Sequence, residues 1–160
     1  MWKNPRYRNI FILAFFAFFL QFIFLAERIY FLSANEFANF WSYSAKAAYN
    51  IVKENQSKYK YVILSDRIDN IEFAYPVYGK INPKEVILQQ DNRTKLDYYD
   101  FKKFDNVFIG SIPQTELKRF LSSLNSSVIY IGPADDQKFF YFPETVVGPD
   151  KVTALTIKRI

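Results

Sequence analysis

The chain has 160 residues, with 21 Lys and Arg against 16 Asp and Glu, which gives a formal net charge of +5. It contains neither cysteine nor histidine, which excludes disulfides, thiolate metal sites and any mechanism that uses histidine as a base or a metal ligand. Catalysis by this chain alone would have to use carboxylates, lysine or tyrosine.

An apolar segment near the N-terminus is the first element. Residues 10–26 carry no charge, and Gln21 is their only strongly polar side chain. With its flanks, a helix here reaches the ~30 Å of a hydrocarbon core at about 1.5 Å of rise per residue. Lys3, Arg6 and Arg8 precede it, so the positive-inside rule keeps the N-terminus in the cytoplasm. We predict a single-pass signal-anchor in the lipid bilayer, divided into a cytoplasmic flank 1–8, a transmembrane helix 9–32 and an extracytoplasmic domain 33–160.

A cleavable secretory signal is the alternative interpretation of this segment. Such signals have an apolar region of about 7–15 residues and end at small residues in an A-x-A pattern. Here the apolar segment ends at Ala26-Glu27-Arg28 without that pattern, and the bulky residues 30–32 follow. A permanent anchor is therefore the favoured prediction.

The rest of the chain predicts alternating helices and strands. Apolar side chains recur at helical spacing over residues 36–54, behind a candidate N-cap. Residues 59–65 form a strand whose continuous apolar run indicates burial on both faces, which is typical of a parallel sheet. The later predicted elements are a polar turn 66–70, a short helix 71–78, a strand 84–90, an unassigned polar and aromatic stretch 91–105, a strand 104–110, a helix beginning at 113, a strand 127–132, and a final edge strand 152–157 with 139–142 as its candidate partner.

The order of these elements predicts an α/β fold. Residues 33–160 are within the usual size of one domain. We expect one three-layer-like α/β domain with a mainly parallel sheet of four to six strands, behind the N-terminal transmembrane helix.

A group of polar residues follows the first predicted strand. Ligands of open α/β sheets bind beyond the carboxyl ends of the strands, which predicts ligand binding at Ser65, Asp66, Arg67 and Asp69. Asp66 and Asp69 are three residues apart, so they do not form a D-x-D metal or phosphatase motif. The alternative is structural: one aspartate caps the next helix, and an aspartate pairs locally with Arg67.

Cofactor sites have little support in the sequence. Asp135 and Asp136 follow a Gly-Pro pair and could bind a hard cation, but a solvated turn is the favoured interpretation, so no metal site is predicted. Neither glycine-rich nucleotide motif is present. Without Lys3, Arg6 and Arg8, 18 basic residues face 16 acidic ones, so we expect no cofactor and no nucleic acid partner.

Several segments of the chain resemble one group of membrane enzymes. These segments are 27–31 at the exit of the apolar helix, 41–48, 59–65, 73–83, 104–110, and 148–150 ahead of the last strand. They look like the C-terminal part of polytopic glycosyltransferases that use polyprenyl-phosphate sugars, such as protein mannosyltransferases and aminoarabinose transferases. In that family, an extracytoplasmic α/β domain follows the last membrane helix.

The resemblance implies a domain that is not catalytic alone. The catalytic carboxylates of that family lie in the first extracytoplasmic loop, between membrane helices that this sequence does not contain, so no catalytic residue is transferred to this chain. We expect the domain to position an acceptor or a partner: the polytopic catalytic part of a glycosyltransferase, a polyprenyl-phosphate sugar or its acceptor. The alternatives are a free-standing single-pass hydrolase or phosphatase that uses Asp66 and Asp69, and a membrane scaffold subunit.

Overall fold

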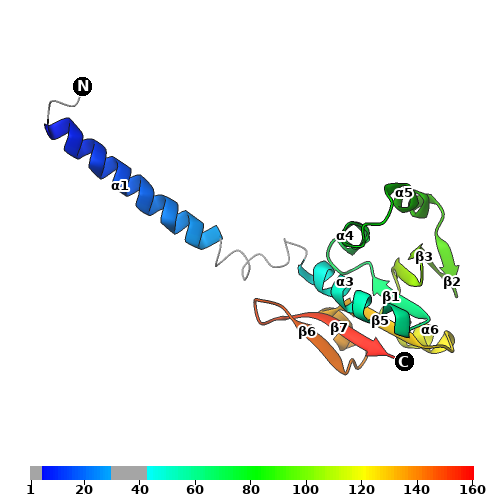
Figure 1. Cartoon of the computed structure of the whole chain (residues 1–160). Coiled ribbons are helices and arrows are strands. Elements are labelled where there is room, and N and C mark those ends of the chain that lie inside the picture. Colours follow the sequence, from blue (N-terminus) through cyan, green and yellow to red (C-terminus); the bar gives the residue numbers. More distant parts are fainter. Residues whose placement is uncertain (1–4, 30–42) are drawn as a thin grey trace. The chain divides into compact units, whose positions relative to one another are not determined.

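A computed structural model of the chain describes residues 5–29 and 43–160 (Figure 1). The chain divides into two compact units, Met1–Phe37 and Ala38–Ile160, and each is described here by itself. The predicted helix over 36–54 is confirmed where it is described, as α3 (Tyr43–Asn55), whereas residues 36–42 lie outside the described residues.

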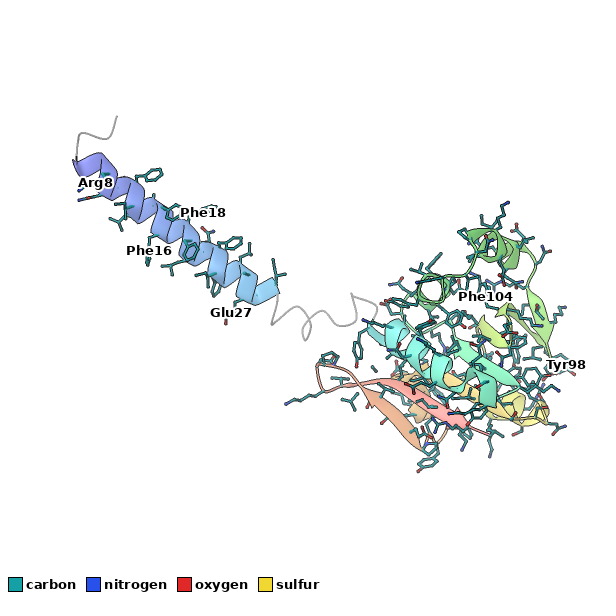
Figure 2. The ribbon with its side chains drawn as sticks, viewed as in Figure 1. Arg8, Phe16, Phe18, Glu27, Tyr98 and Phe104 are labelled. Carbon is teal, nitrogen blue, oxygen red and sulfur yellow. The ribbon has the colours of Figure 1, made fainter. Side chains whose placement is uncertain are left out.

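Among the described residues of the first unit, 5–29, lies the helix α1 (Pro5–Glu27). Its segment Arg8–Glu27 is long and apolar enough to cross a membrane, a test that a signal sequence also passes. Phe16 and Phe18 lie on different sides of the helix and are 60% and 71% exposed (Figure 2). Because apolar side chains project in all directions, α1 lacks the polar face of a helix that packs on a soluble domain.

The second unit is built on a seven-stranded mixed sheet in the order β2-β3-β4-β1-β5-β7-β6. Its strands are β1 (Tyr61–Ser65), β2 (Thr94–Leu96), β3 (Tyr99–Phe104), β4 (Val107–Gly110), β5 (Val128–Pro133), β6 (Glu144–Val147) and β7 (Thr153–Arg159). β1 pairs in parallel with β4 and with β5, whereas the other four strand pairs are antiparallel. The predicted α/β class is confirmed, but the mainly parallel sheet of four to six strands is wrong.

Helices cover both faces of the sheet. They are α3, α4 (Ile71–Tyr78), α5 (Pro83–Asp91) and α6 (Leu117–Ser123), with 3-10 turns η2 (Gln56–Lys58) and η3 (Ala134–Lys138). One buried cluster joins α3 and α4 to one face of the sheet, and a second joins α6 to the other face. Val62 and Leu64 of β1 belong to the first cluster and Ile63 to the second, so β1 is buried on both faces, as its apolar run predicts.

The predicted strand 84–90 is wrong, because this segment is helix α5. Asn82 is the N-cap, and its side-chain oxygen accepts a hydrogen bond from the Lys84 amide at 3.0 Å. Pro83 then occupies the first turn, where its missing N–H costs nothing. Ile87 and Leu88, which made the segment resemble a strand, are 61% and 58% exposed.

Two turns explain the strands that the sequence did not predict. Asp97 and Asp105 adopt positive φ values of 56° and 57°, which aspartate tolerates in tight turns. Asp97 lies between β2 and β3, and Asp105 lies between β3 and β4, so the unassigned stretch forms an antiparallel meander. The predicted strand 104–110 therefore begins later, at Val107.

The C-terminal strand is not an edge strand. β7 lies between β5 and β6, and β6 forms the edge. The predicted partner 139–142 is wrong, because Phe142 packs into the α6-side core. In the meander, the Tyr98 side chain projects into solvent, whereas the Phe104 side chain lies in the core (Figure 2).

Candidate functional site

The topology brings the carboxyl ends of three strands together. β1 lies between β4 and β5, and all three run in the same direction. The chain leaves β1 toward α4 on one face of the sheet and leaves β4 toward α6 on the other face. Such a reversal creates a crevice between the two strand ends, where Ser65 is aligned with Gly110.

The four predicted site residues lie at the end of β1 and in the turn after it, but they do not act as one group. Ser65 is 2% exposed, and its hydroxyl accepts a hydrogen bond from the Arg67 amide at 3.3 Å. The Arg67 guanidinium turns toward Asp136, and Asp69 is exposed to solvent. The structural alternative is also wrong in detail, because α4 has Asn70 as its N-cap and the partner of Arg67 is distant in the sequence.

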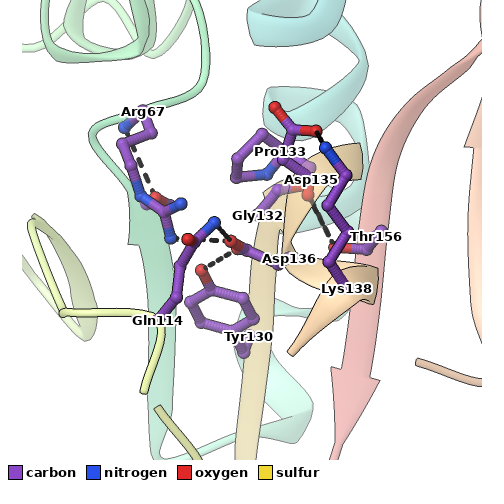
Figure 3. A network of polar contacts seen from close by, with 10 residues as sticks. Arg67, Gln114, Tyr130, Gly132, Pro133, Asp135, Asp136, Lys138 and Thr156 are labelled. Atoms are coloured by element: carbon purple, nitrogen blue, oxygen red, sulfur yellow. Dashed lines mark hydrogen bonds and ion pairs between the residues drawn. The ribbon is translucent and has the colours of Figure 1, made fainter. Parts of the chain in front are cut away.

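A buried carboxylate, Asp136, lies at the centre of a polar network (Figure 3). Its side chain has no solvent exposure and is 2.7 Å from the Arg67 guanidinium. Tyr130 donates a hydrogen bond of 2.6 Å to one carboxylate oxygen, and Gln114 donates one of 3.0 Å to the other. With an ion pair and two hydrogen bonds, Asp136 is satisfied as a structural group and is poorly suited to act as a base.

The electrostatics of this network keep Tyr130 protonated. Burial raises the pKa of the Tyr130 phenol well above its ordinary value, and the charge of Asp136 and their hydrogen bond raise it further. Asp135, the neighbouring aspartate, is instead exposed and pairs with Lys138 at 2.7 Å, which lowers the pKa of the Asp135 carboxyl. The predicted solvated turn is therefore confirmed for Asp135 but is wrong for Asp136, which is buried.

Sequence reasoning missed this network because its members come from four segments. Arg67 follows β1, Gln114 precedes α6, Tyr130 lies in β5 and Asp136 lies in η3. Gly132 was a weak signal: a Cβ atom at this position would lie 2.5 Å from the Tyr130 hydroxyl and would also collide with Asp136. The glycine is required by this close approach.

A cavity of about 260 Å³ adjoins Arg67. Two predicted site residues, Arg67 and Asp69, share it, together with Asp135 and Asp150. Three carboxylates against one guanidinium make its lining acidic, which disfavours an anionic ligand. Among residues 5–29 and 43–160, no group of three acidic side chains is arranged to hold a metal ion.

Asp66 occupies a different environment, outside the lining of this cavity. One oxygen of its carboxylate is buried and has no hydrogen-bond partner among the described residues. Burial is the largest cause that raises the pKa of Asp66, and the charge of Glu72 adds to it, against a hydrogen bond with Ser111. Asp66 is therefore the carboxylate with acid–base potential in this region, and its carboxylate neighbour is Glu72, whereas the predicted partner Asp69 lines the cavity that Asp66 does not line.

The negative charge of Glu72, the neighbour of Asp66, is compensated by two basic side chains. Lys102 reaches it from β3 with a 2.7 Å ion pair, and Arg93 lies 4.0 Å away. The Lys102 side chain is only 7% exposed, so its charge depends on Glu72 for compensation.

Comparisons of the chain with protein-family models, with curated proteins and with solved structures found no match. The likeness to glycosyltransferase tails therefore has no support beyond the sequence segments that suggest it. Function has to be argued from the arrangement of the described residues.

Proposed function

We propose that this chain is a membrane-anchored extracytoplasmic domain that positions an acceptor or a partner and does not itself catalyse a reaction. The observation that carries the proposal is α1, in which 20 residues, Arg8–Glu27, are long and apolar enough to cross a bilayer. Lys3, Arg6 and Arg8 at its N-terminal end favour a cytoplasmic N-terminus.

A positioning role is supported by the carboxylates at the carboxyl ends of the parallel strands. Asp136 is engaged by three partners, and Asp66 and Asp69 lie in separate environments. The chain has no histidine and no cysteine to supply another nucleophile or base. Glycosyl transfer from a lipid phosphate needs a base at the acceptor and cations at the departing phosphate, which a polytopic partner would have to supply.

The partner proposed is the polytopic catalytic part of a glycosyltransferase that uses polyprenyl-phosphate sugars. One apolar helix followed by an α/β domain is the arrangement that the sequence resemblance implies for such a tail. Replacing residues 10–26 by a generic span of equal length tests whether the helix recognises a partner. Co-purification of a polytopic protein should be lost in this variant if the helix makes the contact and kept if the domain makes it. Absence of any co-purifying partner with the unaltered chain would contradict the assignment.

Orientation can be tested directly, because the chain contains no cysteine. Ser122→Cys places a single thiol at an exposed position of α6, and Asn4→Cys places one ahead of α1. A membrane-impermeant maleimide added to intact cells should label the first variant and should label the second only after lysis. The opposite pattern would reverse the proposed orientation, and recovery of a soluble product that lacks α1 would identify a cleaved signal instead.

A single-pass hydrolase or phosphatase is the second candidate, and the state of Asp66 favours it. A carboxylate whose pKa is raised by burial at a strand end is a typical general acid or base. Metal-dependent turnover of a phosphate ester that is abolished by Asp66→Asn would support this function. Retention of that turnover in Asp66→Asn would rule out a hydrolase that uses Asp66.

A further inference from the structure

A second cavity, of about 450 Å³, lies at the other end of the sheet from the predicted site. Its volume is within the ~300–1,000 Å³ typical of small-molecule sites. Its wall comes from α3, α4, the start of α5 and the turn after β3. None of the predicted site residues lines it.

Tyr75 forms the apolar wall of this cavity and brings a hydroxyl to it. The residue is 5% exposed, and its ring packs edge-on against Tyr49 at a centroid distance of 5.9 Å and at a tilt against Phe104 at 6.1 Å. Tyr75 lines the cavity together with Tyr49 and Phe104, the two aromatic residues that its ring contacts. Besides burial, the charges that raise the pKa of Tyr75 belong to Tyr49 and Asp105, which both line the cavity. Tyr75 therefore contributes an aromatic ring and a phenol to the wall of the cavity.

The rim of the cavity is polar but carries no net charge. Two lysines, Lys53 and Lys80, are balanced by two carboxylates, Glu85 and Asp105. Gln56 donates a hydrogen bond of 3.1 Å to Asp105, which orients both groups. A charged ligand of either sign would meet like charges here as well as opposite ones, so this rim suits an uncharged ligand that both donates and accepts hydrogen bonds.

The cavity continues into a neighbouring hollow. Lys53, Gln56 and Asp105 line both, and Tyr59 and Asn106 lie in the second. The Asn106 amide donates to the carbonyl oxygens of Gln56 and Tyr59, at 2.9 and 2.8 Å, which fixes the wall between the strands and η2. Because they share three lining residues, the two hollows form one open groove.

We propose that this groove binds an uncharged saccharide. A pyranose ring would contact the partly exposed Tyr49 ring through its apolar face, and one of its hydroxyls would pair with the Tyr75 hydroxyl. Glu85, Asp105 and Gln56 would accept or donate to the remaining hydroxyls. The proposal deepens the positioning role proposed above, on which it rests, because it names the class of molecule that is positioned.

Saturation-transfer NMR on the full chain in lipid nanodiscs tests the proposal. Nanodiscs are required because glycosidic detergents would compete for the groove. The probes are D-mannose, D-glucose, N-acetyl-D-glucosamine and maltose, with the phosphate ester D-glucose 6-phosphate as an anionic control. We expect transfer to the ring protons of at least one sugar and none to phosphate esters added at the same concentration. This measurement does not depend on the orientation of α1, so it can fail while the labelling experiment succeeds.

Variants locate the binding. Tyr75→Phe removes only the hydroxyl and should weaken binding about threefold to tenfold, the usual effect of one hydrogen bond. Glu85→Gln changes an exposed rim carboxylate, cannot unfold the core, and should weaken binding by a similar factor. Tyr98→Phe is the matched control, since Tyr98 is 78% exposed and lies outside the groove, and it should leave binding unchanged. Absence of transfer to every sugar, or transfer that Tyr75→Phe and Glu85→Gln both leave unchanged, would overturn the proposal.

Discussion

Arg67 and Asp136 form an ion pair of 2.7 Å in which the carboxylate is fully buried and the guanidinium is partly exposed. Arg67 follows β1 and Asp136 follows β5, so the pair fastens the loops at the ends of two adjacent parallel strands. The contact is oriented by Tyr130 and Gln114, which occupy the carboxylate oxygens. Four segments of the domain therefore depend on one buried charge.

Asp136→Asn should lower the free energy of unfolding by about 3–5 kcal/mol, because it removes the charge that compensates Arg67 and weakens the bonds to Tyr130 and Gln114. Urea unfolding of the full chain in detergent micelles, followed by tyrosine fluorescence, measures this loss. Asp135→Asn is the matched control at the next position, since it removes only the exposed pair with Lys138 and should leave the unfolding midpoint unchanged. Equal effects of the two variants would show that the network does not stabilise the domain.

Gly132→Ala should destabilise the domain by about 2–3 kcal/mol, through overpacking of the same network. The added methyl group would lie 2.5 Å from the Tyr130 hydroxyl and would push this ring away from Asp136. Gly79→Ala is the control, because Gly79 ends α4 at an ordinary φ of −75° and its new methyl group would lie 3.2 Å or more from its neighbours. Thermal unfolding of both variants distinguishes the two positions, and a Gly132→Ala midpoint equal to that of the unaltered chain would rule out the close approach.

Lys102 and Glu72 should be energetically coupled. Lys102→Met and Glu72→Gln each leave one partly or fully buried charge without its partner, and each should cost about 2–3 kcal/mol. The double variant replaces the pair by two uncharged side chains and should cost less than the sum of the single changes, with a coupling of about 1–2 kcal/mol. Unfolding free energies of the four proteins complete the cycle, and strict additivity would contradict the pairing.

Stability should fall at alkaline pH because of Tyr75. Burial, followed by the charges of Tyr49 and Asp105, raises the pKa of Tyr75 from 10 to about 12. The unfolded chain loses this proton near pH 10 and the folded chain loses it only near pH 12, so the contribution is complete below pH 10 and disappears as pH rises through 12. It amounts to roughly 2 kcal/mol.

Urea unfolding between pH 8 and 12, with phenolate absorbance recorded in parallel, measures the alkaline loss. Tyr75→Phe should make the decline above pH 10 less steep and leave the part that Tyr130 contributes, whereas Tyr98→Phe, an exposed control, should not change it. A decline that is identical in Tyr75→Phe and in the unaltered chain would assign the pH dependence to other groups, of which Tyr130 is the first because its pKa is also raised.

The sequence predicted elements whose apolar residues are continuous or regularly spaced. β1, β5 and α4 appear where expected, because β1 and β5 are buried throughout or nearly so and α4 buries one side. β3 was missed because Lys102 and Lys103 interrupt its apolar residues, and Lys102 is buried only by pairing with the distant Glu72. α5 was mistaken for a strand because Val86, Ile87 and Leu88 form an apolar run that the domain leaves largely exposed.

The candidate site, too, could be predicted from the sequence only in part. Local patterns pointed to the residues after β1, and Arg67 and Asp69 do share a cavity there. The partners of these residues could not be predicted, since Gln114, Tyr130 and Asp136 reach the site through the strand order β4-β1-β5. Neither could the groove around Tyr75, which depends on the packing of α3 against α4.

The position of β7 has a consequence for biogenesis. Ile160 exchanges two backbone hydrogen bonds of 2.9 Å with Val128, so the last residue of this sequence closes the beginning of β5. Until translation has delivered residues 153–160, β5 presents an open edge in the growing polypeptide, and β6 has no strand to join. During that interval the nascent chain is exposed to aggregation.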